Sequence, residues 1–150
     1  MTEHTRPKRN WKELPPEQIA ALMNRKSEGY LTGLMGFTLI SVSKERVLAR
    51  MEIEKRHMAP NGYLHAASVV ALADSTCGFA VSMYLPEGAE GFTTIEQKPN
   101  FLGTARSGFI LCEGTPAHMF ACRRWPDLIP FNFLEEWIPT TNRFRPELNS

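Results

Sequence analysis

Hydrophobic and polar residues alternate along two neighbouring segments in the first third of the chain, and this pattern predicts a β-hairpin. Residues 37–42 form an alternating run in which both faces carry apolar side chains. Residues 47–54 alternate with a period of two, so that one face is apolar and the other is polar. The polar pair Lys44-Glu45 separates the two runs. We therefore expect a long antiparallel hairpin.

A second pattern, a long apolar run at residues 65–85, predicts the main helix. The run follows the turn signal Pro60-Asn61-Gly62 and is stopped by Pro86. Its residues are apolar on nearly every face, which is typical of a helix that is buried on all sides. We therefore expect this helix to be central and wrapped by a sheet.

Shorter segments complete a predicted order of helix, two strands, long helix and two strands. The first helix opens at Pro15-Pro16-Glu17, where proline fits the first turn and an acid complements the helix dipole. It ends at Gly29. The remaining expectations are a flexible arm at 1–14, strands at 92–98 and 109–113, a bend at 100–103, and a short strand or helical turn at 131–137.

Length, composition and charge fit one ordinary globular domain. The chain has 150 residues, of which 43% are hydrophobic and 22% are charged, so a single core can form. The net charge is +1, and this balance favours neither a nucleic acid nor a membrane surface as a partner. No apolar run reaches the roughly 20 residues that a membrane-spanning helix needs.

The cysteines point to a reducing compartment. Cys77, Cys112 and Cys122 are odd in number and show no C-x-x-C pairing, so neither a disulfide framework nor a zinc site is expected. No metal-ligand cluster or glycine-rich phosphate loop is present in the sequence. The charged N-terminus is not followed by an apolar stretch, unlike a secretory signal. We expect a cytoplasmic protein without a bound metal.

Asp74 is the one charged residue within the apolar run at 65–85. Removing a carboxylate from water without a partner costs several kcal/mol, so its position needs an explanation. One interpretation is a catalytic acid or base at a pocket. The other is a helix whose Asp74 face points to solvent.

Four segments resemble the hotdog-fold acyl-CoA thioesterases of the phenylacetate-degradation (PaaI-like) group, in the 4-hydroxybenzoyl-CoA thioesterase superfamily. The first two are Asn61-Gly62-Tyr63-Leu64-His65-Ala66-Ala67 and Ala71-Leu72-Ala73-Asp74, at the predicted start and middle of the long helix. The others are Phe92-Thr93-Thr94-Ile95-Glu96 and Asn100-Phe101-Leu102-Gly103-Thr104-Ala105-Arg106. They resemble the family's next strand and its N-F-L turn. The resemblance covers roughly residues 33–118.

The resemblance implies an α+β hotdog fold, a curved antiparallel sheet wrapped around the long central helix. It further implies a single domain at 15–150, a homodimer or homotetramer with active sites at the dimer interface, and acyl-CoA as substrate with no separate cofactor. The family's last two strands are not recognisable in residues 119–150, where the sequence departs from the family by divergence or by a changed reading frame. We therefore leave the C-terminal strands open.

For the reaction, the resemblance assigns Asp74 as general base or nucleophile and the backbone N–H of Ala66 as oxyanion donor. The residues lie eight positions apart, about two helical turns, and Ala66 is at the positively polarised helix start. We expect Asp74 of one subunit and Ala66 of its partner to flank one thioester. The chain has Ala66-Ala67 where the family commonly has Gly-Gly, and Ala59 where it has a polar residue.

Further site residues each carry two interpretations. His65 either orients the thioester or caps the helix, and Thr93 or Thr94 either positions water or stabilises a strand. Arg106 either meets a coenzyme A phosphate or is solvated, and Asn61 is favoured as a turn former. The substrate-binding set implied by the resemblance is Asn61, Gly62, Ala67, Thr93, Asn100 and Arg106.

Three functions remain open from the sequence. The first is thioester hydrolysis, and the second is a hotdog domain that binds an acyl thioester or a protein without cleaving it. A hotdog dehydratase is the third, but that class carries a His/carboxylate pair in a different motif. Cys77, three positions after Asp74, has no base at helical spacing and is interpreted as a packing residue.

Overall fold

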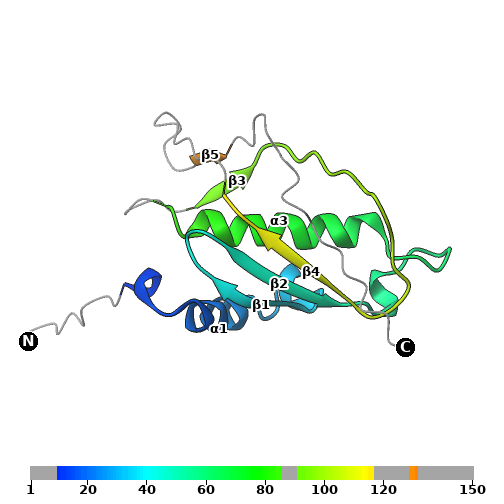
Figure 1. Ribbon diagram of the computed structural model, residues 1–150, viewed down its shortest axis with the longest axis horizontal. Coiled ribbons are helices and arrows are strands. Elements are labelled where there is room, and N and C mark those ends of the chain that lie inside the picture. Colours follow the sequence, from blue (N-terminus) through cyan, green and yellow to red (C-terminus); the bar gives the residue numbers. More distant parts are fainter. Residues whose placement is uncertain (1–9, 86–90, 117–128, 132–150) are drawn as a thin grey trace, which may run out of the picture.

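The computed structural model describes residues 10–85, 91–116 and 129–131, and within them it confirms the predicted α+β architecture. In Figure 1 a long helix runs lengthwise along an antiparallel sheet. The described elements are η1 (Trp11–Glu13), α1 (Pro16–Lys26), α2 (Leu31–Leu34), β1 (Phe37–Val42), β2 (Val47–Glu52), η2 (Lys55–His57), α3 (Ala66–Ser82), β3 (Phe92–Thr94), β4 (Phe109–Gly114) and β5 (Ile129–Phe131).

The predicted hairpin is present as β1 and β2, which pair antiparallel with Phe37 opposite Met51. Strand β2 also pairs antiparallel with β4, giving the order β1-β2-β4. A shift in register between Leu39 and Ser41 marks a bulge in β1. Strand β2 ends at Glu52, two residues before the predicted end, and a 3-10 helix follows.

Helix α3 lies along this sheet with one narrow stripe fully buried. Ser68, Leu72, Thr76 and Ala80 are buried at intervals of four residues, one helical turn apart. Most other α3 side chains are half-buried, and its first two residues, Ala66 and Ala67, are exposed. The prediction of burial on every side was therefore wrong, because the sheet covers only one face of the helix in the described residues.

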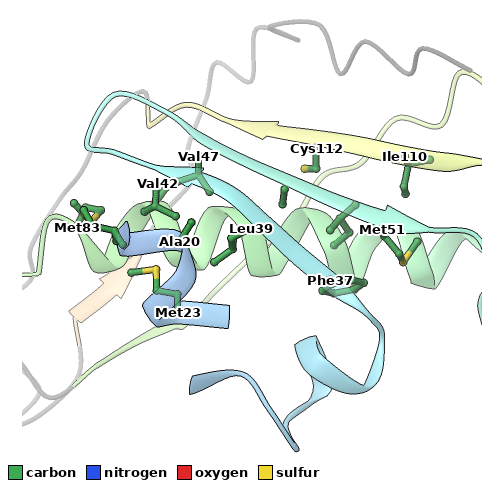
Figure 2. Close-up of a cluster of buried hydrophobic side chains, with 14 of the residues drawn as sticks. Ala20, Met23, Phe37, Leu39, Val42, Val47, Met51, Met83, Ile110 and Cys112 are labelled. Carbon is green, nitrogen blue, oxygen red and sulfur yellow. The ribbon is translucent and has the colours of Figure 1, made fainter. Parts of the chain in front are cut away.

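The core is formed where the sheet, α3 and α1 meet (Figure 2). Inward side chains of β1 and β2 alternate with half-buried or exposed ones, as the sequence pattern predicts. The buried hydrophobic residues include Ile19, Ala20 and Met23 from α1, and Leu39, Val42, Val47, Ala49, Met51, Ile110 and Cys112 from the strands. Burying such side chains contributes about 1.5–3 kcal/mol each for the larger ones.

The outer edge of β1 is met by a side chain of α1. The Asn24 amide nitrogen donates to the Leu39 carbonyl at 2.9 Å, and the Leu39 N–H donates to the Asn24 amide oxygen, also at 2.9 Å. This pair of bonds reproduces the pattern with which a neighbouring strand would bind. Asn24 therefore fixes α1 to the sheet edge at the position of the bulge.

Strand β3 is shorter than the sequence predicts. It covers Phe92–Thr94 rather than 92–98, and residues 95–100 are exposed without regular structure. The one described strand that pairs with β3 is β5, in parallel. Of the short element predicted at 131–137, only residue 131 lies within the described residues.

The short helical elements η1, α2 and η2 were not predicted, and η1 lies in the expected N-terminal arm. Within η1, the Lys12 ammonium donates to the Leu85 carbonyl at 2.7 Å, and Trp11 packs against the core. Residues 1–9 of the arm lie outside the described residues. In the described part of the chain, no helix has the length and apolarity to cross a bilayer.

Candidate functional site

Asp74 is half-buried in the middle of α3 and is met by two side chains from the segment that follows the helix. The Thr94 hydroxyl donates to Asp74 Oδ1 at 2.8 Å. The Gln97 amide nitrogen donates to the same oxygen in a short contact. Within the described residues no partner binds Oδ2. One oxygen of the carboxylate is thus held, and the other is left available for chemistry.

The approach of this segment to α3 depends on a glycine one turn after Asp74. A Cβ placed on Gly78 would lie 3.0 Å from the ring of Phe92. Glycine at this position therefore lets β3 pack closely against the helix. Because Phe92 begins β3, this contact places Thr94 near Asp74.

The start of α3 carries the predicted oxyanion donor. Ala66 is the first residue of the helix and is exposed, and its N–H has no acceptor within the helix because of its position. Across the described residues no other acceptor meets this N–H. The side chain of His65 caps the helix, since its Nδ1 accepts from the N–H of Ala67, not of Ala66, at 3.0 Å. The Ala67 N–H is therefore occupied.

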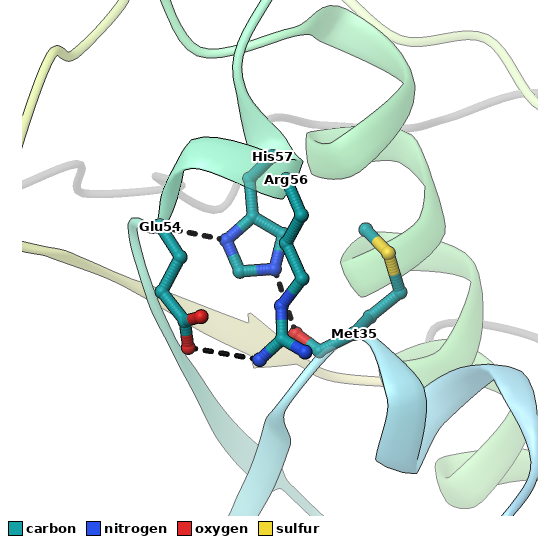
Figure 3. A network of polar contacts seen from close by, with 4 residues as sticks. All are labelled: Met35, Glu54, Arg56 and His57. Carbon is teal, nitrogen blue, oxygen red and sulfur yellow. Dashed lines mark hydrogen bonds and ion pairs between the residues drawn. The ribbon is translucent and has the colours of Figure 1, made fainter.

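A buried histidine, which the sequence analysis did not single out, holds the region before α3 in place (Figure 3). The Glu54 N–H donates to Nδ1 of His57, and the other ring nitrogen, Nε2, lies 3.0 Å from the Met35 carbonyl. This pattern requires a neutral ring with its proton on Nε2. The His57 carbonyl accepts from the Ser68 hydroxyl and from the His65 N–H. His57 therefore links η2 to the first turn of α3.

The turn before α3 is formed by the residues predicted for it. Asn61 accepts from the Tyr63 N–H at 3.2 Å, which is the local hydrogen bond of a turn former. Gly62 has φ +81°, a left-handed conformation that favours glycine. The Arg106 guanidinium lies 4.2 Å from the centre of the Tyr63 ring and also donates to its hydroxyl. Arg106 is thus held beside the helix start.

Thr94 is the one predicted site residue that hydrogen-bonds to Asp74 in the described part of the chain, and its segment holds two more predicted residues, Thr93 and Asn100. Thr93 is exposed and neighbours Thr94 in β3, where successive side chains point to opposite faces. Asn100 is exposed beyond the end of β3. For both residues the described part of the chain contains no hydrogen bond to the Asp74 carboxylate. Their substrate-binding roles stay predictions.

The interpretation of Cys77 as a packing residue fits its surroundings. Burial, with smaller contributions from the neighbouring Cys112 and Asp74, raises the pKa of the Cys77 thiol from 9.0 to about 12. Burial likewise raises the pKa of Cys112. A thiol of this kind carries almost no thiolate at neutral pH and is a poor nucleophile. Among the described residues, no cluster of three His, Cys, Asp or Glu side chains is arranged to hold a metal ion.

Gln97 is the contact of Asp74 that the sequence analysis missed. In a continuous strand at 92–98, Thr94 and Gln97 would face opposite sides, because their separation is an odd number of residues. The structure ends the strand at Thr94, and both side chains reach the same oxygen.

Comparison with known proteins finds similarity to esterases and thioesterases. Residues 61–120 match the model of the thioesterase superfamily. The chain is 25% identical over 85 residues to "Putative esterase ComA2" of Bacillus subtilis, an alignment that covers 57% of this chain and 68% of that protein. It is 26% identical over 97 residues to "1,4-dihydroxy-2-naphthoyl-CoA hydrolase" of Escherichia coli, covering 65% and 71% of the two chains.

Solved structures of thioesterases have a similar fold. The thioesterase HI1161 of Haemophilus influenzae superposes with a TM-score of 0.63 and 26% sequence identity, covering 67% of this chain and 70% of that one. These similarities support a hydrolase of ester or thioester bonds. The resemblance identified in the sequence is therefore confirmed: the chain has a hotdog fold, and its residues 61–120 match the thioesterase superfamily.

Proposed function

We propose that the protein hydrolyses acyl-CoA thioesters to a free acid and coenzyme A. The observation that carries this proposal is the Asp74 carboxylate, which is half-buried on α3 with Oδ1 bound by Thr94 and Gln97. A carboxylate held in this way can act as a general base or a nucleophile. The similarity to a CoA hydrolase supports coenzyme A as the leaving group.

Two routes lead from this carboxylate to the same products. In the first, Oδ2 of Asp74 takes a proton from water while the water oxygen attacks the thioester carbonyl carbon. The tetrahedral intermediate then collapses with cleavage of the C–S bond, and the CoA sulfur leaves with the proton. In the second, Oδ2 attacks the carbonyl carbon directly, the C–S bond breaks, and CoA leaves as a thiolate that takes a proton from solvent. Water then hydrolyses the resulting anhydride, which releases the free acid and restores the Asp74 carboxylate.

The oxyanion formed in either route needs hydrogen-bond donors. The exposed N–H of Ala66 at the start of α3 supports this role, because the helix dipole favours negative charge there. Ala66 and Asp74 of one chain are separated by about 12 Å along the helix axis. One carbonyl cannot contact both groups at that separation. We therefore place the Ala66 N–H of a partner subunit opposite Asp74 in a homodimer or homotetramer.

The remaining proposed contacts surround the helix start. Arg106, held against Tyr63, is proposed to bind a phosphate of coenzyme A. Asn61, Gly62 and Ala67 are proposed to line the thioester at the same end of α3. Thr93 and Asn100 extend this set along the next segment. No cofactor is proposed, and the thiol form of Cys77 and Cys112 supports the proposed cytoplasmic location.

A second candidate is a hotdog domain that binds acyl thioesters or a protein without hydrolysis. The observation that favours it lies at the helix start, where the Ala67 N–H is already bound by His65. Of the N–H groups of Ala66 and Ala67, only that of Ala66 is then available to an oxyanion. A site with one donor stabilises the intermediate less than a site with two.

The test is release of CoA by the purified protein from a panel of aromatic, medium-chain and short branched acyl-CoAs. Asp74→Asn should lower kcat/KM by about 100-fold or more, the range expected for loss of a general base. The matched control is Glu113→Gln, which makes the same carboxylate-to-amide change on β4. Glu113 forms a surface ion pair with Arg46. Binding of acyl-CoA by a folded protein that releases no CoA would favour the second candidate.

A further inference from the structure

Gln97 belongs to the segment after β3, and its side chain ends on the Asp74 carboxylate. We propose that Gln97 is a positioning residue, which with Thr94 fixes the orientation of Asp74 for thioester hydrolysis. This inference rests on the proposed function, since it assumes that Asp74 is the reacting carboxylate. It assigns to the exposed segment 95–100 a part in the reaction.

The geometry of the carboxylate explains why two donors are needed. The terminal torsion of an aspartate is broad, so the plane of its carboxylate is poorly fixed by the helix alone. Thr94 binds Oδ1 from the last residue of β3, and Gln97 binds the same oxygen from three residues further on. Two donors on one oxygen restrict rotation of the carboxylate more than one donor does. As a result Oδ2 is presented in one direction.

The backbone that carries these donors is itself anchored to the helix. The Phe92 ring lies over Gly78, where any Cβ would approach it to 3.0 Å. Gly78 is one turn after Asp74, so this contact sets the distance between β3 and the reacting residue. Gln97 is exposed, and a long exposed side chain is ordered at an entropic cost. Its ordering here is balanced by a hydrogen bond to a charged group, which is stronger than one between neutral groups.

The end of β3 is the feature that makes this arrangement possible. A regular strand through residue 97 would turn the Gln97 side chain away from the face that carries Thr94. Because the strand ends at Thr94, the residues after it do not follow the strand's alternation, and both donors reach one oxygen. We therefore assign the strand ending a role in the site as well as in the fold.

The experiment compares steady-state CoA release by the wild type, Gln97→Met and Gln97→Glu. Methionine keeps the length of the side chain but removes the donor, and we expect kcat to fall about tenfold with KM changed less than twofold. Glutamate places a like charge beside Asp74, and we expect a larger fall in kcat. The matched control is Gln18→Met, the same change at an exposed glutamine of α1, which should leave kcat unchanged.

A double-mutant cycle separates positioning from a general structural effect. If Gln97 acts through Asp74, Gln97→Met should change the residual rate of Asp74→Asn less than twofold. An equal loss in both backgrounds, or a change confined to KM, would overturn the inference. So would unchanged kcat in Gln97→Met and Gln97→Glu, with the wild type still dependent on Asp74. No turnover by the folded wild type would overturn the proposed function and this inference together.

Discussion

Two histidines offer a direct test of how burial changes the value of one hydrogen bond. His57 and His65 each accept a backbone N–H on Nδ1 at 3.0 Å. His57 is 1% exposed, whereas His65 lies on the surface at the start of α3. We predict that His57→Ala destabilises the fold several times more than His65→Ala does.

The expected magnitudes follow from what each substitution leaves behind. Removing His57 deprives the Glu54 N–H and the Met35 carbonyl of partners and opens a cavity in the interior. An unsatisfied buried group costs about 1–3 kcal/mol, and a large-to-small change in a core costs about 2–5 kcal/mol. Because Glu54 is exposed and its N–H regains water, we expect about 3–4 kcal/mol in total. Loss of the exposed cap at His65 should cost about 1 kcal/mol.

Urea unfolding followed by circular dichroism measures both values. At this chain length each kcal/mol corresponds to a shift in Tm of about 2–4 °C, so thermal melts should fall by about 10 °C for His57→Ala and about 3 °C for His65→Ala. The urea m-value should stay unchanged if the two variants unfold from the same compact state. Equal losses of stability in the two variants would refute the argument that burial decides the difference.

Two further predictions concern packing and thiol chemistry. Gly33→Ala should destabilise the fold by more than 1 kcal/mol in urea unfolding, although alanine normally stabilises a helix by about that amount, because its Cβ would clash with the Ser27 carbonyl oxygen; Gly103→Ala, whose Cβ meets nothing, should be nearly neutral, and a stabilised Gly33→Ala would contradict the clash. Because burial raises the pKa of Cys77 to about 12, its thiol holds a proton in the folded state that the unfolded chain loses above pH 9.0, so stability should be full below that pH and fall as pH rises toward 12. In a Cys122→Ser background, alkylation at pH 8 should be slow until denaturant is added, whereas rapid labelling of the native protein would contradict the burial of Cys77.

The parts of the fold that depend on local periodicity could be predicted from sequence. The hairpin of β1 and β2 follows from a period of two residues, and the long helix follows from a long apolar run between a turn signal and Pro86. Their positions agree with the structure to within a few residues. The extent of helix burial could not be predicted in this way. An apolar helix surface shows that burial is favourable, but not which neighbour supplies it.

The candidate site likewise contains residues that the sequence pattern identified and residues that it did not. Asp74 was found because a charge within an apolar helix conflicts with its surroundings. Gln97 gave no such signal, since its role depends on where β3 stops and on the contact that its side chain then makes with Asp74. His57 was missed because it lies in a polar stretch, Glu54–His57, where nothing local indicates burial. Contacts that form between segments far apart in sequence are the ones that pattern alone leaves out.

The bond pair between Asn24 and Leu39 has a consequence for the behaviour of the protein in concentrated solution. Strand β1 ends the β1-β2-β4 sheet, and unpaired peptide groups on such a strand can recruit a strand of another molecule. The Asn24 amide occupies one donor and one acceptor of that row at its middle. A single side chain of α1 thereby disfavours the addition of a strand from another molecule, and so aggregation, at this edge of the sheet.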